Sequence, residues 1–206
     1  MIRLFVGIEL PDELRQRIAL IQTGVERAQW VPTENIHLTL RFIGNILGDV
    51  EADALDALET IHAPPFSLTV DGAGHFESRK RLRALWLSVE RSDALIDLRN
   101  RIESALVRAG LEPERRKYKP HITIARINNG SPGIARSWLS ANTMFRSVPF
   151  TVESFVLFSS HLSREKAIYT PEAEFPLTIK SGAGKSGAGF ATKPISVASY
   201  SSGNLD

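Results

Sequence analysis

Two short segments combine residues that could move protons beside a phosphate: HLTL at positions 37–40 and HITI at positions 121–124. In each segment a polar residue alternates with an aliphatic one, which predicts a strand with one face in the core. Because side chains alternate across a strand, His37 shares a face with Thr39, and His121 shares one with Thr123. We expect the two polar faces to line a cleft in which the two histidines meet.

This pair of motifs fits acid–base chemistry at phosphorus. Imidazole has an ordinary pKa of about 6.5, so one ring can be neutral while the other is protonated near neutrality. Opening a cyclic phosphodiester needs a base that deprotonates water and an acid that protonates the departing ribose oxygen. The threonine hydroxyls can donate to the non-bridging oxygens. A single His-x-Thr segment is more simply a half-buried structural strand, but its repetition favours catalysis.

Two arginines follow the motifs and could add positive charge for a phosphate. Arg41 is evenly spaced from His37, so we expect it on the face of His37 and Thr39, although a solvated rim position fits equally. Arg126 is oddly spaced from His121 and would point away on a straight strand. It reaches the cleft only if the strand bends before it.

The hydrophobic periodicity indicates strands alternating with helices. Predicted strands cover residues 2–10, 36–43, 66–70, 84–90, 121–127, 150–159 and 167–175. Predicted helices cover residues 11–28, 49–62, 92–109 and 133–141. The two halves of the chain repeat this order, which favours an α+β or α/β protein with two facing lobes that carry sheets.

Composition narrows the class of protein. The 206 residues are 43% hydrophobic, which suits one domain or two closely packed lobes, predicted over residues 1–178. The absence of cysteine excludes disulfides and thiolate chemistry, and a cytoplasmic location is expected. Residues 179–206 are rich in Ser, Gly and Ala, which predicts a flexible tail. Its Gly184-Lys185-Ser186 is not a phosphate-binding P-loop, because Ile179 stands where that motif needs glycine.

The remaining polar features are weaker. His62, His75 and His161 have no threonine two residues later and are interpreted as surface or structural histidines. Basic clusters lie at residues 76–83 and 115–119, and each is either an RNA backbone contact or a solvated loop. Phe42, Tyr118 and Phe158 could stack a terminal base, although such aromatics more often belong to a core.

The two HxTx motifs and their flanks resemble the 2H phosphoesterase superfamily and, within it, the RNA 2′,3′-cyclic phosphodiesterases, also called 2′-5′ RNA ligases. The resemblance covers residues 1–178 and rests on these stretches: RLFVGI at 3–8, WVP at 30–32, NIHLTLRFIG at 35–44, KPHITIAR at 119–126 and FVLFSS at 155–160. It implies an α+β fold with two pseudo-symmetric lobes, each with an antiparallel sheet and helices, and an active-site cleft between them.

The resemblance also assigns roles. It implies that His37 is the proton donor, that His121 is the proton acceptor, and that Thr39 and Thr123 bind the phosphate. The implied substrate is RNA with a 2′,3′-cyclic phosphate end, opened to a 2′-phosphate, and reversible 2′-5′ RNA ligation is implied beside this hydrolysis. No cofactor, no metal and no membrane partner are expected, and the expected state is a monomer.

Three other functions stay open. The first is a phosphodiesterase for small cyclic nucleotides or for ADP-ribose cyclic phosphate, which the motifs do not distinguish from an RNA enzyme. The second is an RNA-binding module without catalysis, which the presence of both histidines and both threonines disfavours. The third is a metal hydrolase, disfavoured because no Asp or Glu accompanies the histidines at ligand spacing.

Overall fold

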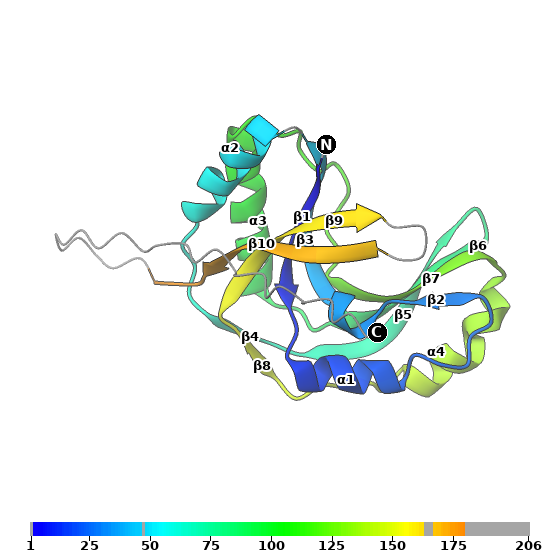
Figure 1. Ribbon diagram of the computed structural model, residues 1–206. Helices are drawn as coiled ribbons and strands as arrows, with labels where there is room; N and C mark the ends of the chain where they lie inside the picture. The colour runs from blue at the N-terminus through cyan, green and yellow to red at the C-terminus, as the bar shows by residue number, and fades with distance from the viewer. Residues whose placement is uncertain (1, 47, 163–166, 180–206) are drawn as a thin grey trace, which may run out of the picture.

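A computed structural model describes residues 2–46, 48–162 and 167–179 of the chain as an α+β protein with two four-stranded antiparallel sheets (Figure 1). The first sheet has the order β10-β9-β1-β3, with β1 (Ile2–Glu9), β3 (His37–Ile46), β9 (Ser154–Leu162) and β10 (Ala167–Pro176). The second has the order β2-β7-β6-β5, with β2 (Ala28–Trp30), β5 (Val70–Ser78), β6 (Arg81–Val89) and β7 (His121–Gly130). Strands β4 (Phe66–Leu68) and β8 (Phe150–Val152) form a separate pair.

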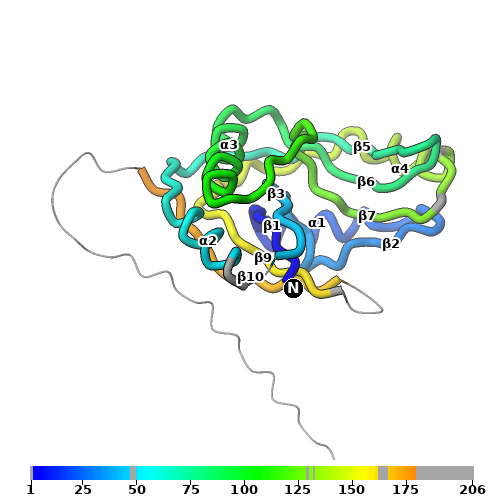
Figure 2. Tube along the Cα trace, turned by 90° about the horizontal axis from the view of Figure 1, so that it is seen from above, coloured from blue at the N-terminus to red at the C-terminus, as the bar shows by residue number. Residues whose placement is uncertain are grey.

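Two pairs of helices cover the sheets, as Figures 1 and 2 show. Helices α2 and α3 pack together beside the first sheet, and α1 and α4 lie along the second. Their bounds are α1 (Asp12–Leu20), α2 (Gly48–Glu59), α3 (Asp93–Arg108) and α4 (Arg136–Asn142), with 3₁₀ turns η1 (Thr33–Asn35) and η2 (Pro132–Ala135). Because β9 and β10 return to the first sheet, each lobe draws strands from both halves of the chain.

Helix α3 shows why the sequence folds locally as it does. Ser92 caps its start, with the side-chain oxygen accepting a hydrogen bond of 3.2 Å from the Leu95 backbone N–H. Its buried face includes Leu95, Leu98 and Ile102, at helical spacing. Gly110 follows the helix with a φ of 92°, a conformation that glycine adopts without strain. The predicted helix over residues 92–109 is confirmed.

Three predicted elements were wrong. The helix expected over residues 11–28 ends at Leu20, because the backbone then turns through positive φ at Gly24 and Arg27. Residues 28–30 instead form β2, which pairs with β7. The strand predicted over 66–70 is divided between β4 and β5, and β5 continues to Ser78 through polar residues that hid its periodicity. The strand predicted over 150–159 is likewise divided, because β8 pairs with β4 while β9 pairs with β1.

One hydrophobic core cluster joins residues of both sheets, among them Val6, Leu38, Leu85 and Ile122. The expectation of a single domain over residues 1–178 stays a prediction. The tail predicted for 179–206 lies, except for Ile179, outside the described residues, and so does the rejected P-loop segment. Among the described helices, none is long and apolar enough to cross a membrane.

Candidate active site

The two HxTx motifs open two neighbouring strands of different sheets. His37 is the first residue of β3 and His121 the first of β7, and these strands contact each other between the sheets. Burial alternates as predicted, because the histidine and threonine of each motif are half-buried while both aliphatic residues are buried. The charge of His121 reaches the His37 ring, since His121 is one of the groups that lower the pKa of His37.

The His37 ring is held at both nitrogens. Its Nδ1–H donates to the Asn35 carbonyl at 2.7 Å, which leaves Nε2 to accept from the Thr39 hydroxyl at 2.9 Å when the ring is neutral. The Asn35 side chain is itself fixed, donating to the Ala167 carbonyl at 2.7 Å. The two carbonyl contacts therefore tie β3, and His37 with it, to the start of β10.

Aromatic rings surround His37. Phe5, Phe158 and Tyr169 lie with ring centroids 4.7, 5.9 and 5.3 Å from the imidazole. Gly7 leaves room for this packing, since a Cβ there would lie 3.3 Å from His37 Cδ2. Burial is the largest cause that lowers the pKa of His37, to about 4, against the Asn35 hydrogen bond, which raises it.

His121 has an analogous support. Its Nδ1–H donates to the Lys119 carbonyl at 2.6 Å, so Nε2 carries the lone pair in the neutral ring. Phe76 stands perpendicular to the imidazole at 4.8 Å, and Trp86 lies at 6.2 Å. Lys119 Nζ sits 4.4 Å from the Trp86 ring centre. Burial is the largest cause that lowers the pKa of His121, with the positive charge of Lys119 acting in the same direction.

Arg126 reaches the first lobe because β7 is irregular. Opposite β6, Leu85 pairs with Ala125 but Trp86 pairs with Thr123, so Ile124 is an extra residue that shifts the alternation. This bulge changes the alternation between His121 and Arg126, so Arg126 does not point away as it would on a straight strand. Arg126 Nη2 donates to the Tyr169 hydroxyl at 3.4 Å, and its charge lowers the pKa of His37.

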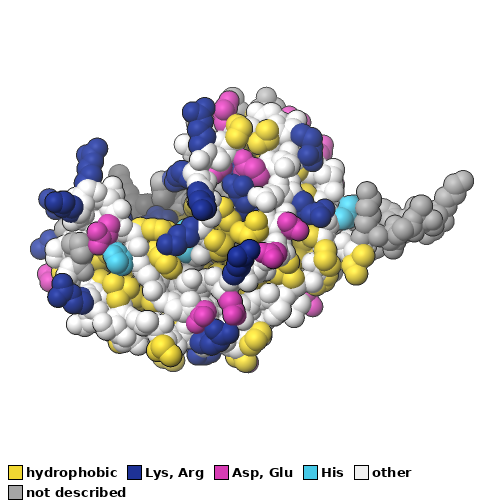
Figure 3. Space-filling model, turned by 180° about the vertical axis from the view of Figure 1, so that it is seen from behind, with side chains coloured by type: hydrophobic (Ala, Val, Ile, Leu, Met, Phe, Trp, Pro, Cys, Tyr) yellow, Lys and Arg dark blue, Asp and Glu magenta, His cyan; other side chains and the backbone are white. Residues whose placement is uncertain are grey.

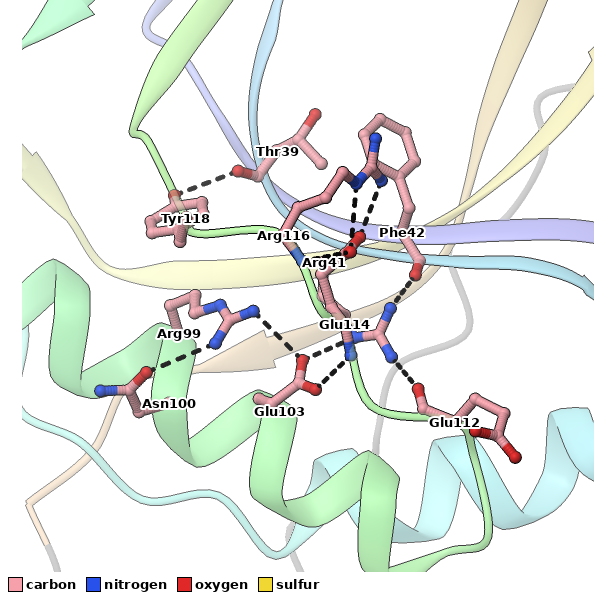
Figure 4. A network of polar contacts seen from close by, with 10 residues as sticks. All are labelled: Thr39, Arg41, Phe42, Arg99, Asn100, Glu103, Glu112, Glu114, Arg116 and Tyr118. Atoms are coloured by element: carbon pink, nitrogen blue, oxygen red, sulfur yellow. Dashed lines mark hydrogen bonds and ion pairs between the residues drawn. The ribbon is translucent and has the colours of Figure 1, made fainter.

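Arg41 does not behave as its spacing predicted. Opposite β1, Val6 pairs with Arg41 but Gly7 pairs with Thr39, so Leu40 is bulged out and the alternation shifts. Arg41 is buried, and its Nε lies 2.6 Å from Glu103 Oε2 (Figure 4). Its other nitrogens donate to two backbone carbonyls, those of Phe42 and Glu112. The expectation that Arg41 shares the face of His37 was wrong. An even spacing places two residues on one face only in a regular strand, and the bulge at Leu40 interrupts the alternation.

A pocket of about 470 Å³ opens beside the motifs and includes Thr39 and His121 in its lining. The other residues of its lining are mostly aromatic or basic: Phe42, Phe76, Tyr118, Arg41, Arg99, Arg116, Lys117 and Lys119, with Leu40 and Glu114. Figure 3, seen from behind, shows hydrophobic side chains exposed between groups of Lys and Arg side chains. The basic cluster at residues 115–119 therefore contributes to the wall of the candidate site.

Neither His62 nor His75 shows a contact with the motif histidines among the contacts described. His75 pairs with Glu77 at 2.9 Å, and His62 lines a separate pocket beside α3. Within the described ranges, no group of three or more His, Cys, Asp or Glu residues is arranged to hold a metal ion. The sequence does not predict Phe5 and Tyr169 around His37, or Trp86 beside His121, because strand partners bring them there and no local motif marks them.

Comparison with known proteins gives a consistent result. A sequence profile of the 2′-5′ RNA ligase superfamily matches residues 10–164. The RNA 2′,3′-cyclic phosphodiesterase of Escherichia coli strain K12 is 31% identical over 185 residues, covering 85% of this chain and 97% of that protein. The protein of the same name from Thermotoga maritima is 31% identical over 175 residues, covering 81% and 91%.

A solved structure is also similar. The crystal structure of E. coli LigT in complex with 3′-AMP superposes with a TM-score of 0.72 at 31% identity, covering 86% of this chain and 99% of that one. Together with the two antiparallel sheets and their helices, this likeness confirms the predicted bilobal α+β fold.

Proposed function

The chain belongs to the 2′-5′ RNA ligase superfamily, and we propose that it is the enzyme that hydrolyses RNA 2′,3′-cyclic phosphate ends to 2′-phosphate ends without a metal. The relatives named RNA 2′,3′-cyclic phosphodiesterase support the cyclic phosphodiester as substrate. The observation that carries the mechanism is the pair of imidazoles, each with Nδ1–H bound to a backbone carbonyl. Each ring thereby directs Nε2 to the proton transfer.

In the proposed reaction, His121 Nε2 takes a proton from water as the water oxygen attacks phosphorus. The bond between phosphorus and O3′ breaks, and His37 Nε2 gives its proton to O3′. His121 gains one proton and His37 loses one, so proton exchange with solvent returns both rings to their starting states. Thr39, Thr123 and Arg126 would donate to the non-bridging oxygens, where negative charge concentrates. Arg41 is left out of this set, because its guanidinium is committed to Glu103 and to carbonyls.

His37 can act as the proton donor only if the bound substrate favours the protonated form of its ring. With its pKa lowered to about 4, His37 is neutral near pH 7 in the unliganded protein. A phosphodiester carries a negative charge, and an opposite charge within a few ångström favours the protonated ring. We therefore propose that substrate binding itself protonates His37, so that the acid is charged only when there is a leaving group to receive the proton.

Ligation follows from the same groups. If a 5′-hydroxyl of a second RNA replaces the water, His121 deprotonates it, and attack on the cyclic phosphate forms a 2′-5′ linkage as O3′ leaves. The superfamily description supports this reaction as the partner of hydrolysis.

The test uses a short RNA with a 2′,3′-cyclic phosphate, incubated with the protein in EDTA, followed by mapping of the product end. We expect hydrolysis to a 2′-phosphate in EDTA, and His121→Ala protein prepared in parallel should be inactive. Loss of activity in EDTA that a divalent ion restores would refute metal independence. Preference for a cyclic mononucleotide or for ADP-ribose cyclic phosphate would move the substrate to a small molecule.

A further inference from the structure

A largely buried polar network borders the pocket, which Arg41 and Arg99 help to line, and is centred on Glu103 of α3 (Figure 4). The Glu103 side chain is 15% exposed, and its Oε2 lies 2.6 Å from Arg41 Nε and 3.3 Å from Arg99 Nη2. Arg41 belongs to β3 of the first sheet, and Arg99 lies one turn before Glu103 on α3. One carboxylate therefore holds the helix against the strand that carries His37 and Thr39.

The same carboxylate also holds the connector, defined as residues 109–120 between α3 and β7. Glu103 Oε1 accepts a hydrogen bond of 2.8 Å from the Glu114 backbone N–H. Arg41, which Glu103 orients, donates to the Glu112 carbonyl. Two separate points of the connector are thus fixed by the Glu103–Arg41 pair.

From the connector, contacts run to both motifs. The Tyr118 hydroxyl donates to the Thr39 carbonyl at 3.1 Å, and the guanidinium carbon of Arg99 lies 5.5 Å from the centre of the Tyr118 ring. The next residue, Lys119, provides the carbonyl that accepts from His121 Nδ1. Adjacent residues of the connector therefore touch the threonine of one motif and the histidine of the other.

We propose that Glu103 is a positioning residue for the reaction: through Arg41, Arg99 and the connector it sets where His121 stands relative to Thr39. This inference rests on the proposed function. A buried ion pair is a weak source of stability, and apolar replacement of both partners is often neutral or stabilising. A displacement of the reacting groups by about 1 Å can cost about 100-fold in rate. Stability and rate can therefore be separated at this pair.

The experiment compares Glu103→Leu, Arg41→Met and the double variant on a short RNA with a 2′,3′-cyclic phosphate end, with kcat, KM and melting temperature measured for each. Glu103→Leu leaves Arg41 and Arg99 without their carboxylate, and Arg41→Met leaves Glu103 with Arg99 alone, so we expect a lower melting temperature in both single variants. The double variant removes one charge of each sign and leaves Arg99 against the Tyr118 ring, so its melting temperature should lie closer to that of the wild type than that of Glu103→Leu. Its kcat should nevertheless stay about 10- to 100-fold low, with KM changed much less, because the connector is no longer held.

The matched control is Arg101→Met, on the same helix, since Arg101 makes only a long hydrogen bond of 3.4 Å to the His62 carbonyl among the contacts described. It should keep both kcat and melting temperature.

Recovery of kcat as well as melting temperature in the double variant would overturn the proposal. Glu103 would then serve only to neutralise the charge of Arg41. If the single variants fail to fold, the double variant and Glu103→Gln, which keeps an acceptor for Glu114, still decide the question. Inactive wild-type protein would instead refute the proposed function.

Discussion

Strands β3 and β7 have the same backbone plan but different neighbours. Each begins with its histidine and bulges at the fourth motif residue, Leu40 in one and Ile124 in the other. The two positions after each bulge are buried and then exposed in both strands.

The residues at those equivalent positions differ. β3 buries Arg41 and exposes Phe42, whereas β7 buries Ala125 and exposes Arg126. One strand therefore brings an aromatic ring toward the pocket and the other brings a charge toward Tyr169. Two strands with the same backbone plan can therefore carry different chemistry, because the side chains that follow each motif differ.

The largest expected effect separates the two histidines. His37→Ala and His121→Ala should each lower kcat on the natural linkage by about 10²–10⁴, the usual contribution of a general acid or base. With sulfur in place of the bridging 3′-oxygen, the leaving thiol has a pKa of about 8.5 and needs little help from an acid. His37→Ala should then be largely rescued, while His121→Ala stays inactive, as single-turnover rates would measure. Rescue of His121→Ala alone would show that the roles are reversed.

The threonines should matter nearly as much. Thr39→Ala and Thr123→Ala should each slow turnover by about 10²–10³, the effect of removing one oxyanion donor. Thr39 also donates to His37 Nε2, so Thr39→Ala should in addition shift the pH profile of kcat, whereas Thr123→Ala should not. Serine variants, which keep the hydroxyl, serve as controls. Unchanged rates in both alanine variants would mean that the hydroxyls do not face the substrate.

Replacement of Arg126 should lower the activity less than replacement of a threonine does, and more than replacement of its partner Tyr169 does. Arg126→Met removes a charged hydrogen-bond donor, typically worth about 1.5–3 kcal/mol, so kcat/KM should fall by about 10- to 100-fold. Tyr169→Phe removes only the 3.4 Å partner of Arg126 and is the matched control, expected to lose much less. Equal losses in the two variants would show that Arg126 acts by holding Tyr169.

The smallest effect concerns stability and pH. Because the pKa of His37 is lowered from 6.5 to about 4 on folding, the unfolded chain binds more protons between these values. Stability therefore falls as the pH drops below 6.5, by at most roughly 3 kcal/mol near pH 4 and by less for a half-buried ring. Urea unfolding of the wild type and of His37→Gln from pH 7 to pH 4.5 should show a shallower decline in the variant. Parallel declines would place the titrating group elsewhere.

Much of the site could be predicted from the sequence because its signals are local. The alternation of HLTL and HITI follows from the two-residue period of a strand, and His37, Thr39, His121 and Thr123 lie on the faces predicted for them. The Ser92 cap and the apolar spacing of α3 are local for the same reason. The family, too, was recognised from contiguous residues and is confirmed by the comparisons.

Tertiary structure alone decided what lies around those residues. The side of the strand on which Arg41 and Arg126 lie depends on bulges, and a bulge exists only when a partner strand sets the register, here β1 for Leu40 and β6 for Ile124. The low pKa of His37 depends on rings from β1, β9 and β10, which lie far apart along the chain. The Glu103 network joins a helix, a strand and a connector. Sequence spacing specifies the face of an isolated strand, but pairing between strands specifies what that face meets.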